Sequence, residues 1–275
     1  MKVRKKALLC TTFLVFALLF AATVKADDVA FVGENNADFG TLDLNSGAFT
    51  LLGNSSQTLA GMAVADGELF ASSYHLSTGT LFEVNPANGN LKTIGTSSVD
   101  IDDFGSTTSG LYVIGTDKNL YSVNPTTGAE TLIGPTGIAS FGSWRSLSTN
   151  SSILYFANGT SLYSISTTTG AATLIGSLGT AEIGAMVFED GTLYGGANIP
   201  GETVDTINTS TGAASTGDAP SSGFVSTFFA LAPFPIPTSG GGGSTPGVPE
   251  PSSFLMLASG LLALMPIKNK LLRKA

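Results

Sequence analysis

The densest group of residues that could bind a metal or take part in a reaction consists of three aspartates, Asp100, Asp102 and Asp103. In an extended strand Asp100 and Asp102 point the same way, and two hard carboxylates at this spacing could share a Ca²⁺ ion. The segment lacks the ligand spacing and the turn glycine of an EF-hand loop, so solvated acids are the simpler interpretation. We therefore expect no metal and no other cofactor, with Ca²⁺ as the alternative.

His75 is the only histidine, which excludes a histidine-rich metal centre. A Ser–His–Asp triad would need His75 beside an activated serine, and no Gly-x-Ser-x-Gly elbow marks one. The sequence also lacks a phosphate-binding loop and a dinucleotide fingerprint. His75 follows Tyr74 in a Ser/Thr-containing loop and is expected to face solvent. We expect no catalytic residue, although acids on neighbouring parts of the fold could still converge as a glycosidase pair.

The charge of the chain differs sharply between its regions. The 275 residues carry a formal net charge of −8, but nine of the twelve Lys and Arg lie in residues 1–26 and 268–275. Residues 27–247 hold nineteen acids and three cations, a net charge of −16. The three cations are Lys92, Lys118 and Arg145. Such an excess disfavours nucleic acid and anionic lipid as partners, and it favours solubility, divalent cations or basic partners.

The N-terminal segment, residues 1–26, is predicted to be a signal peptide. Four cations precede an apolar run, and the small residues Val24 and Ala26 fit a signal-peptidase site. We expect cleavage after Ala26. A retained membrane anchor is the alternative, but the apolar run is shorter than a full span. The only cysteine, Cys10, lies in this segment, so the mature chain is expected to contain no disulfide.

The C-terminal end has three parts in a fixed order. A Pro/Gly/Ser linker (234–247) leads to a short Pro-Glu-Pro motif, then to an apolar segment (254–267), then to a basic tail. The motif consists of Val248, Pro249, Glu250 and Pro251. An apolar segment followed by positive charge is a stop-transfer element, and its 14 residues would span a membrane only marginally. We predict a transmembrane sorting helix, with a plain C-terminal anchor as the alternative.

Residues 248–275 resemble the PEP-CTERM sorting signal of Gram-negative bacteria, which is also catalogued as an ice-binding protein C-terminal domain. The resemblance rests on Pro249, Glu250 and Pro251, followed by the apolar helix and the basic end. It covers this segment alone and carries no information about the body of the chain. It implies processing by an exosortase, transient anchoring in the inner membrane, and delivery to the cell envelope, the surface or the exopolysaccharide matrix.

The body of the chain is a repeat of about 42 residues. Five segments share an apolar-x-apolar-Asn/Ser-x-x-x-Gly pattern, and their turn glycines are 42, 39, 42 and 42 residues apart. These glycines are Gly47, Gly89, Gly128, Gly170 and Gly212. Alternating apolar and polar residues predict half-buried strands, and centres such as Asn-Pro-x-x-Gly predict turns. Each segment is therefore expected to form a β-hairpin.

A second repeated hairpin lies between these segments. Its copies are 59–70, 101–112, 183–194 and, with a three-residue insertion, 141–155. Two hairpins make a four-stranded antiparallel unit, which at this period is typical of a propeller blade. We predict an all-β fold, a five-bladed β-propeller over residues 27–233. A C-terminal strand within 224–233 would complete the N-terminal blade beside 27–36 and hide both edges. An open solenoid and a β-sandwich are the alternatives.

The predicted ring places the candidate side chains at one rim. Connections between the second and third strands of a blade, and between blades, share this rim, which would carry Tyr74, His75 and Asp100. Function usually lies on longer loops, whereas the tight turns of the opposite rim look structural. Asp102 and Arg145 fall on inner strands of neighbouring blades. Because burial of either charge alone is costly, we expect them to form a structural ion pair. These five residues are the candidate ligand contacts.

Together these features predict an exported, non-enzymatic interaction or scaffold module that binds glycan or protein at the loop-bearing rim. The expected partners are an exosortase-type processing enzyme, an exopolysaccharide or surface protein, and the membrane through the C-terminal helix before processing. The alternative is an enzyme that acts on extracellular polysaccharide through channel-facing carboxylates. The predicted regions are the signal peptide (1–26), the propeller (27–233), the linker (234–247) and the sorting signal (248–275).

Overall fold

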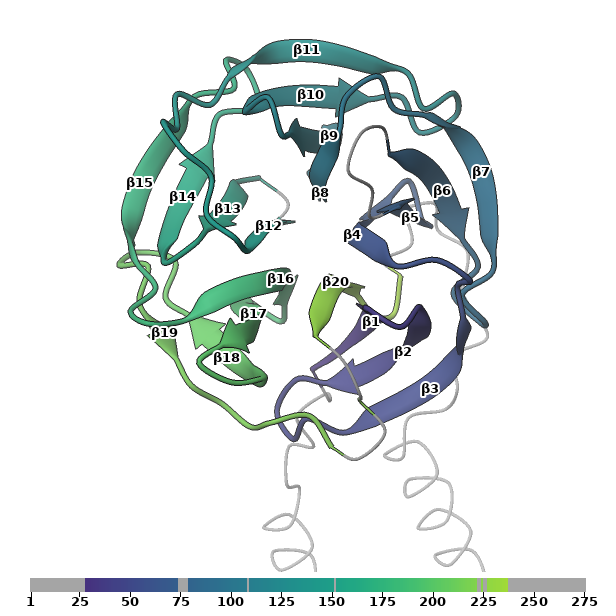
Figure 1. Cartoon of the computed structure of the whole chain (residues 1–275), viewed down its shortest axis with the longest axis vertical. Helices are drawn as coiled ribbons and strands as arrows, with labels where there is room; N and C mark the ends of the chain where they lie inside the picture. Colours follow the sequence, from purple (N-terminus) through teal and green to yellow (C-terminus); the bar gives the residue numbers. More distant parts are fainter. Residues whose placement is uncertain are drawn as a thin grey trace, which may run out of the picture. The chain divides into compact units, whose positions relative to one another are not determined.

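The computed structural model describes residues 28–236 except 74–78, 108, 151, 222–223 and 225–226 (Figure 1). Of Asp102, Phe228 and Phe229 only the backbone is described. The predicted cleavage site at Ala26 and the sorting motif at 248–251 lie outside the described residues. Within the described part of the chain, no helix is long and apolar enough to cross a membrane.

Twenty strands in the described residues form five antiparallel four-stranded sheets, numbered here as blades 1 to 5. Blade 1 contains β20 (Phe228–Pro233), β1 (Val29–Glu34), β2 (Asp38–Asp43) and β3 (Phe49–Asn54). Blade 2 contains β4 (Leu59–Ala65), β5 (Glu68–Ser73), β6 (Thr80–Val84) and β7 (Leu91–Thr96). Blade 3 contains β8 (Ile101–Thr107), β9 (Gly110–Gly115), β10 (Asn119–Val123) and β11 (Glu130–Pro135). Blade 4 contains β12 (Arg145–Thr149), β13 (Leu154–Asn158), β14 (Ser161–Ile165) and β15 (Ala172–Ser177), and blade 5 contains β16 (Glu182–Glu189), β17 (Thr192–Ile199), β18 (Thr203–Ile207) and β19 (Ala214–Ser215).

The five blades form a ring around a central axis. Their innermost strands, β4, β8, β12, β16 and β20, contact one another in cyclic order and surround the centre of Figure 1. A hydrophobic cluster fills each of the five junctions between neighbouring blades. Between blades 3 and 4, for example, the fully buried side chains of Ile114, Leu154 and Phe156 pack together. The body is a five-bladed β-propeller, as the repeat predicts.

Blade 1 brings together the two ends of the described chain. β20 pairs antiparallel with β1, with Phe31 opposite Ala232 and Val32 opposite Leu231. The strand covers only the second half of the predicted segment 224–233. In blade 5 the outer strand β19 has two residues, in keeping with the loosely kept fifth copy of the repeat.

The hairpin turns follow the mechanism that their sequences predict. In blade 3, Oδ1 of Asn124 accepts hydrogen bonds from the N–H groups of Thr126 and Thr127 at 2.9 and 3.0 Å. Gly128 then takes a φ of +69° and donates to the Asn124 carbonyl. A φ in this range suits glycine because a Cβ would strain the backbone. Asn85 and Asn208 build the same turn in blades 2 and 5.

A second set of glycines forms joints between blades, a role that the sequence analysis did not assign. The glycine near the end of an outer strand lies against the turn of the next blade, so a Cβ on Gly95 would stand 2.8 Å from the Thr127 carbonyl oxygen. From the other side, a Cβ on Gly128 would stand 3.1 Å from the Gly95 Cα. Four junctions share this joint: Gly53 with Asn88, Gly95 with Thr127, Gly134 with Thr169, and Gly176 with Thr211.

Candidate functional site

The two rims of the ring carry different connections. Tight turns join the third to the fourth strand of every blade, and the first to the second strand of blades 2 to 5, at what we call the turn rim. The other connections lie at the loop rim. Asp100, Asp102 and Arg145 lie at the loop-rim ends of β8 and β12, on neighbouring blades. Tyr74 and His75 belong to the connection between β5 and β6, outside the described residues.

Asp102 occupies a β-bulge on an inner strand. The pairing of β8 with β9 skips Asp102, and the pairings of β4 and β16 with their partners skip Ala60 and Gly184 in the same way. A bulge changes the direction of a side chain, and bulges recur beside functional sites. The same bulge therefore recurs in the inner strands of three blades at the loop rim, and in blade 3 the bulged residue is an acid.

Arg145 is held by the connection that leads from β11 into its own strand, β12. Its Nη1 donates a hydrogen bond to the Gly142 carbonyl, and its guanidinium lies over the Phe141 ring, 5.4 Å from the centroid. A cation over an aromatic face is attracted to the ring electrons. The Asp102 side chain is not among those described, so its ion pair with Arg145 stays a prediction. Their strands, β8 and β12, are in contact.

Asp103 is buried and serves the structure. Its side chain is 2% exposed, and its carboxylate accepts hydrogen bonds from the N–H groups of Phe104 at 2.6 Å and of Leu147 on β12. It also lies directly against β4, because a Cβ on Gly61 of that strand would overlap Oδ1 of Asp103. The carboxylate thus contacts the innermost strands of blades 2, 3 and 4, and it satisfies N–H groups on strands that have no further strand to pair with.

The expectation of no metal, and its alternative of a Ca²⁺ ion between Asp100 and Asp102, stay untested because the second carboxylate lies outside the described side chains. Among the side chains that are described, no three His, Cys, Asp or Glu residues are placed to hold a metal ion.

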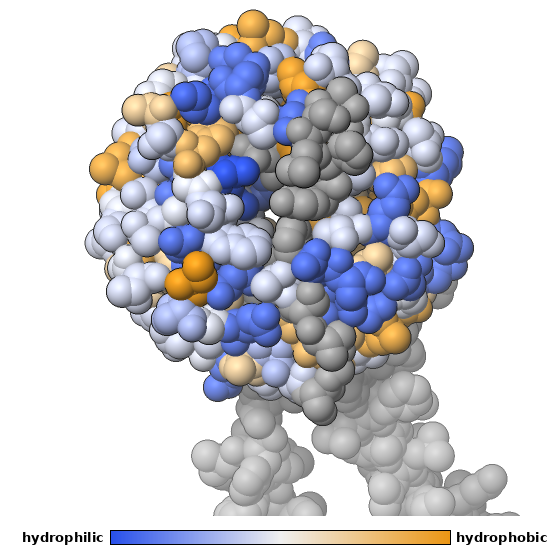
Figure 2. Space-filling view, in the orientation of Figure 1, coloured by the Kyte–Doolittle hydropathy of each residue, from blue (hydrophilic) through white to orange (hydrophobic). Residues whose placement is uncertain are grey.

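The perimeter of the ring presents single apolar side chains. Leu51, Leu132 and Leu174 occupy the same position of the repeat in β3, β11 and β15 and are 57–60% exposed. Figure 2 shows apolar residues scattered over the visible face among polar ones. Isolated exposed apolar side chains are common on soluble proteins and do not define a docking surface.

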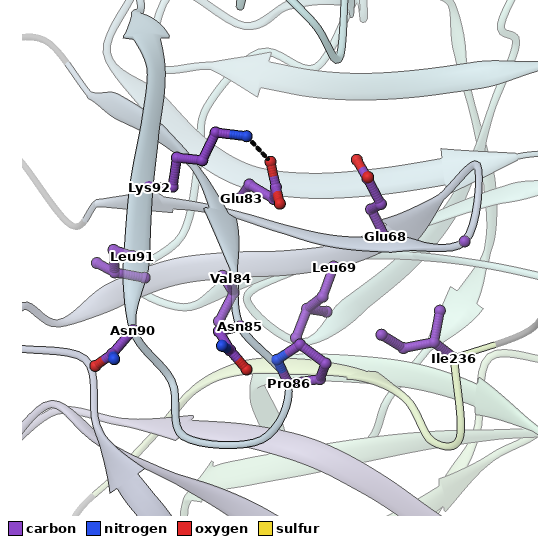
Figure 3. Close-up of a pocket in the computed structure, with 11 residues that line it drawn as sticks. Glu68, Leu69, Glu83, Val84, Asn85, Pro86, Asn90, Leu91, Lys92 and Ile236 are labelled. Atoms are coloured by element: carbon purple, nitrogen blue, oxygen red, sulfur yellow. Dashed lines mark hydrogen bonds and ion pairs between the residues drawn. The ribbon is translucent and has the colours of Figure 1, made fainter.

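A pocket of about 440 Å³ lies on the turn rim of blade 2, opposite the rim that the sequence analysis favoured (Figure 3). Its apolar lining includes Leu69, Val84, Leu91 and Ile236. Its charged lining consists of Glu68, Glu83 and Lys92. Nζ of Lys92 donates to Glu83 at 2.6 Å, and this hydrogen bond, with the negative charge of Glu83, raises the pKa of Lys92. The turns judged purely structural from the sequence therefore border a cavity.

Carboxylates gather where blade 5 meets blade 1. The buried Asp28 accepts hydrogen bonds from Oη of Tyr194 at 2.6 Å and from Nδ2 of Asn45 at 3.1 Å, which links the two blades. Burial, followed by the hydrogen bond to Asp28, raises the pKa of Tyr194. Burial and repulsion by Asp190 and Asp28 raise the pKa of Glu189 to about 7.

We expect Glu189→Gln to stabilise the protein at pH 8 and to have little effect at pH 5. The folded pKa of about 7 lies above the ordinary value of 4.5, so the stability of the native protein falls as the pH rises between these values. Allowing for solvent screening, the ionised carboxylate costs about 1–2 kcal/mol at pH 8, and glutamine removes that cost. Thermal unfolding at both pH values measures the effect, with the exposed Glu202→Gln as control. An unchanged melting temperature at pH 8 would contradict this account.

No protein-family model and no curated protein matches the sequence. Solved structures match it by shape. A chain of a nidogen/laminin complex superposes with a TM-score of 0.53 at 8% identity, over 77% of this chain and 100% of that chain. A protein of unknown function from Bacteroides caccae gives a TM-score of 0.46 at 10% identity, over 76% and 99% of the two chains. The first likeness supports the propeller fold and, at this identity, the fold alone.

Proposed function

We propose that this protein is an exported, non-enzymatic β-propeller that acts as an interaction or scaffold module at the cell surface or in the extracellular matrix. The support for export is in the sequence: a predicted signal peptide over residues 1–26, cleaved after Ala26, and residues 248–275 with their resemblance to a PEP-CTERM signal. An exosortase-type enzyme would process that signal, and the C-terminal helix would hold the chain in the membrane until then. The charge of −16 on residues 27–247 suits a soluble body.

The observation that carries the binding role is the arrangement of the loop rim. The connections there belong to different blades, and Asp100, Asp102 and Arg145 lie at the loop-rim ends of β8 and β12, two inner strands in contact. Loops held by a rigid scaffold are the usual place for recognition. With Tyr74 and His75 in an adjoining connection, this rim would offer hydroxyl, imidazole, carboxylate and guanidinium groups. Such groups suit a glycan or a polar protein surface, and the acidic body disfavours nucleic acid.

An enzyme that acts on extracellular polysaccharide is the second candidate. It is favoured by the bulge that holds Asp102 on an inner strand, close to Asp100 and beside the strand that carries Arg145. Two carboxylates facing a sugar could act as acid and base, or as acid and nucleophile.

A glycan array followed by an assay for released sugar separates these two functions. We expect binding without release, and we expect Asp102→Asn to weaken binding about tenfold, the value of one charge-assisted hydrogen bond. The exposed Asp218→Asn is the matched control and should bind like the native protein. Release of sugar that disappears in Asp102→Asn would favour the enzyme. If the protein retains no glycan and no matrix protein, recognition at the loop rim is wrong.

A further inference from the structure

The pocket on the turn rim of blade 2 has an excess of negative charge on one side. Figure 3 shows Glu83 standing between Lys92 and Glu68. The ammonium of Lys92 is paired with Glu83, opposite which it lies in the register of β6 and β7. The carboxylate of Glu68, on β5, forms no hydrogen bond or ion pair with the side chains that the structure describes, and its charge acts on Lys92 only from a distance. Two carboxylates therefore face the pocket with one cation, and that cation lies on the side away from Glu68.

The remaining lining of the pocket is mostly apolar, with the amides of Asn85 and Asn90 at its edge. Leu69 and Val84 are buried and form its floor, and Ile236 packs against the same cluster from the segment that follows β20. The volume of about 440 Å³ falls in the range of small-ligand sites. A ligand that fits these surfaces has a positive head and an apolar stem.

We propose that this pocket binds a lysine or arginine side chain presented by a basic peptide segment of a partner protein. The positive head would lie between Glu68 and Glu83, and the methylene stem would lie against the partly exposed Ile236, above the buried Leu69. An anion would meet two carboxylates and a lysine already paired. A neutral sugar would find no aromatic ring among the lining residues to stack on. The acidic body would also attract basic segments from a distance.

A fluorescent pentapeptide with two lysines separated by a leucine, titrated with the purified full chain, tests this proposal. The same peptide with both lysines acetylated keeps the stems and removes the charges. We expect the lysine peptide to bind, the acetylated peptide not to bind, and high salt to weaken binding. The double variant Glu68→Gln, Glu83→Gln should weaken binding at least tenfold. Glu68→Gln alone, which preserves the Glu83–Lys92 pair, should weaken it about threefold.

The control variant is Glu202→Gln, which removes an exposed acid at the loop rim and should leave peptide affinity unchanged. Equal binding of the acetylated peptide would show apolar docking alone and overturn the proposal. Native affinity in the folded double variant would place the peptide elsewhere on the acidic surface, and absence of binding by the native protein would refute the site outright. Glycan binding concerns the opposite rim, so either function can fail without the other.

Discussion

Replacing Gly176 by alanine should lower the free energy of unfolding by about 3 kcal/mol or more. A Cβ at this position would stand less than 3.0 Å from the carbonyl oxygen and carbonyl carbon of Thr211 in the next blade. Both atoms belong to the backbone, so no side-chain rotation relieves the overlap. Blades 4 and 5 would have to move apart, and the cluster that contains Ile183 and Met186 would lose packing with them.

Chemical denaturation with and without the substitution measures this loss. Gly201→Ala is the matched control, since a Cβ there meets nothing within 4 Å, and it should change stability by less than about 0.5 kcal/mol. Gly95→Ala should cost less stability than Gly176→Ala, because its Cβ would stand farther from the facing carbonyl oxygen, at 2.8 Å. Native stability in Gly176→Ala would mean that the joint is loose enough to accept a side chain.

Asp103→Ala should lower the free energy of unfolding by about 3 kcal/mol. The substitution leaves the N–H groups of Phe104 and Leu147 buried without an acceptor, and each such group costs about 1–3 kcal/mol. Asp103→Asn keeps one carbonyl oxygen and should cost less. Thermal and chemical unfolding measure both losses.

The control for Asp103 is Asp218→Ala, which removes an exposed acid. If Asp103→Ala and Asp218→Ala unfolded at the same denaturant concentration, the carboxylate would not support the inner strands. Because Asp103 lies on the same strand as Asp102, the glycan array should be run on Asp103→Asn as well. A loss of stability without a loss of glycan binding would separate the structural acid from the candidate ligand contact.

Local patterns allowed the fold to be predicted. Alternation of apolar residues within each copy, and turns that rest on Asn124 and its equivalents, are set by residues a few positions apart. The joints and the inner acid depend instead on residues 32 to 44 positions apart, such as Gly95 with Thr127 and Asp103 with Leu147. A glycine repeated at the same position of each copy indicates that a side chain would not fit there. It does not indicate which distant backbone segment occupies the space.

The candidate site was predictable only in part. The sequence placed Asp100, Asp102 and Arg145 at the ends of inner strands, because hairpin alignment fixes strand order. It missed the pocket on the turn rim. One signal was available there, since Lys92 replaces the threonine found at the same position of three other outer strands and lies opposite Glu83 in a hairpin. The part of the pocket formed by Ile236 was not predictable, because this residue follows the last strand of the propeller and packs against blade 2 from there.

The glycine joint has a consequence for how such a ring can change in evolution. Blades 2 to 4 each contact the preceding blade through a turn and the following blade through a glycine. Each of these blades therefore carries both partners of the same contact. Duplication of a gene segment that encodes one unit would therefore insert a blade already matched to its neighbours, and only the angle between blades would need to adjust. Such a protein could therefore gain or lose a whole blade more easily than it could replace one joint glycine by alanine.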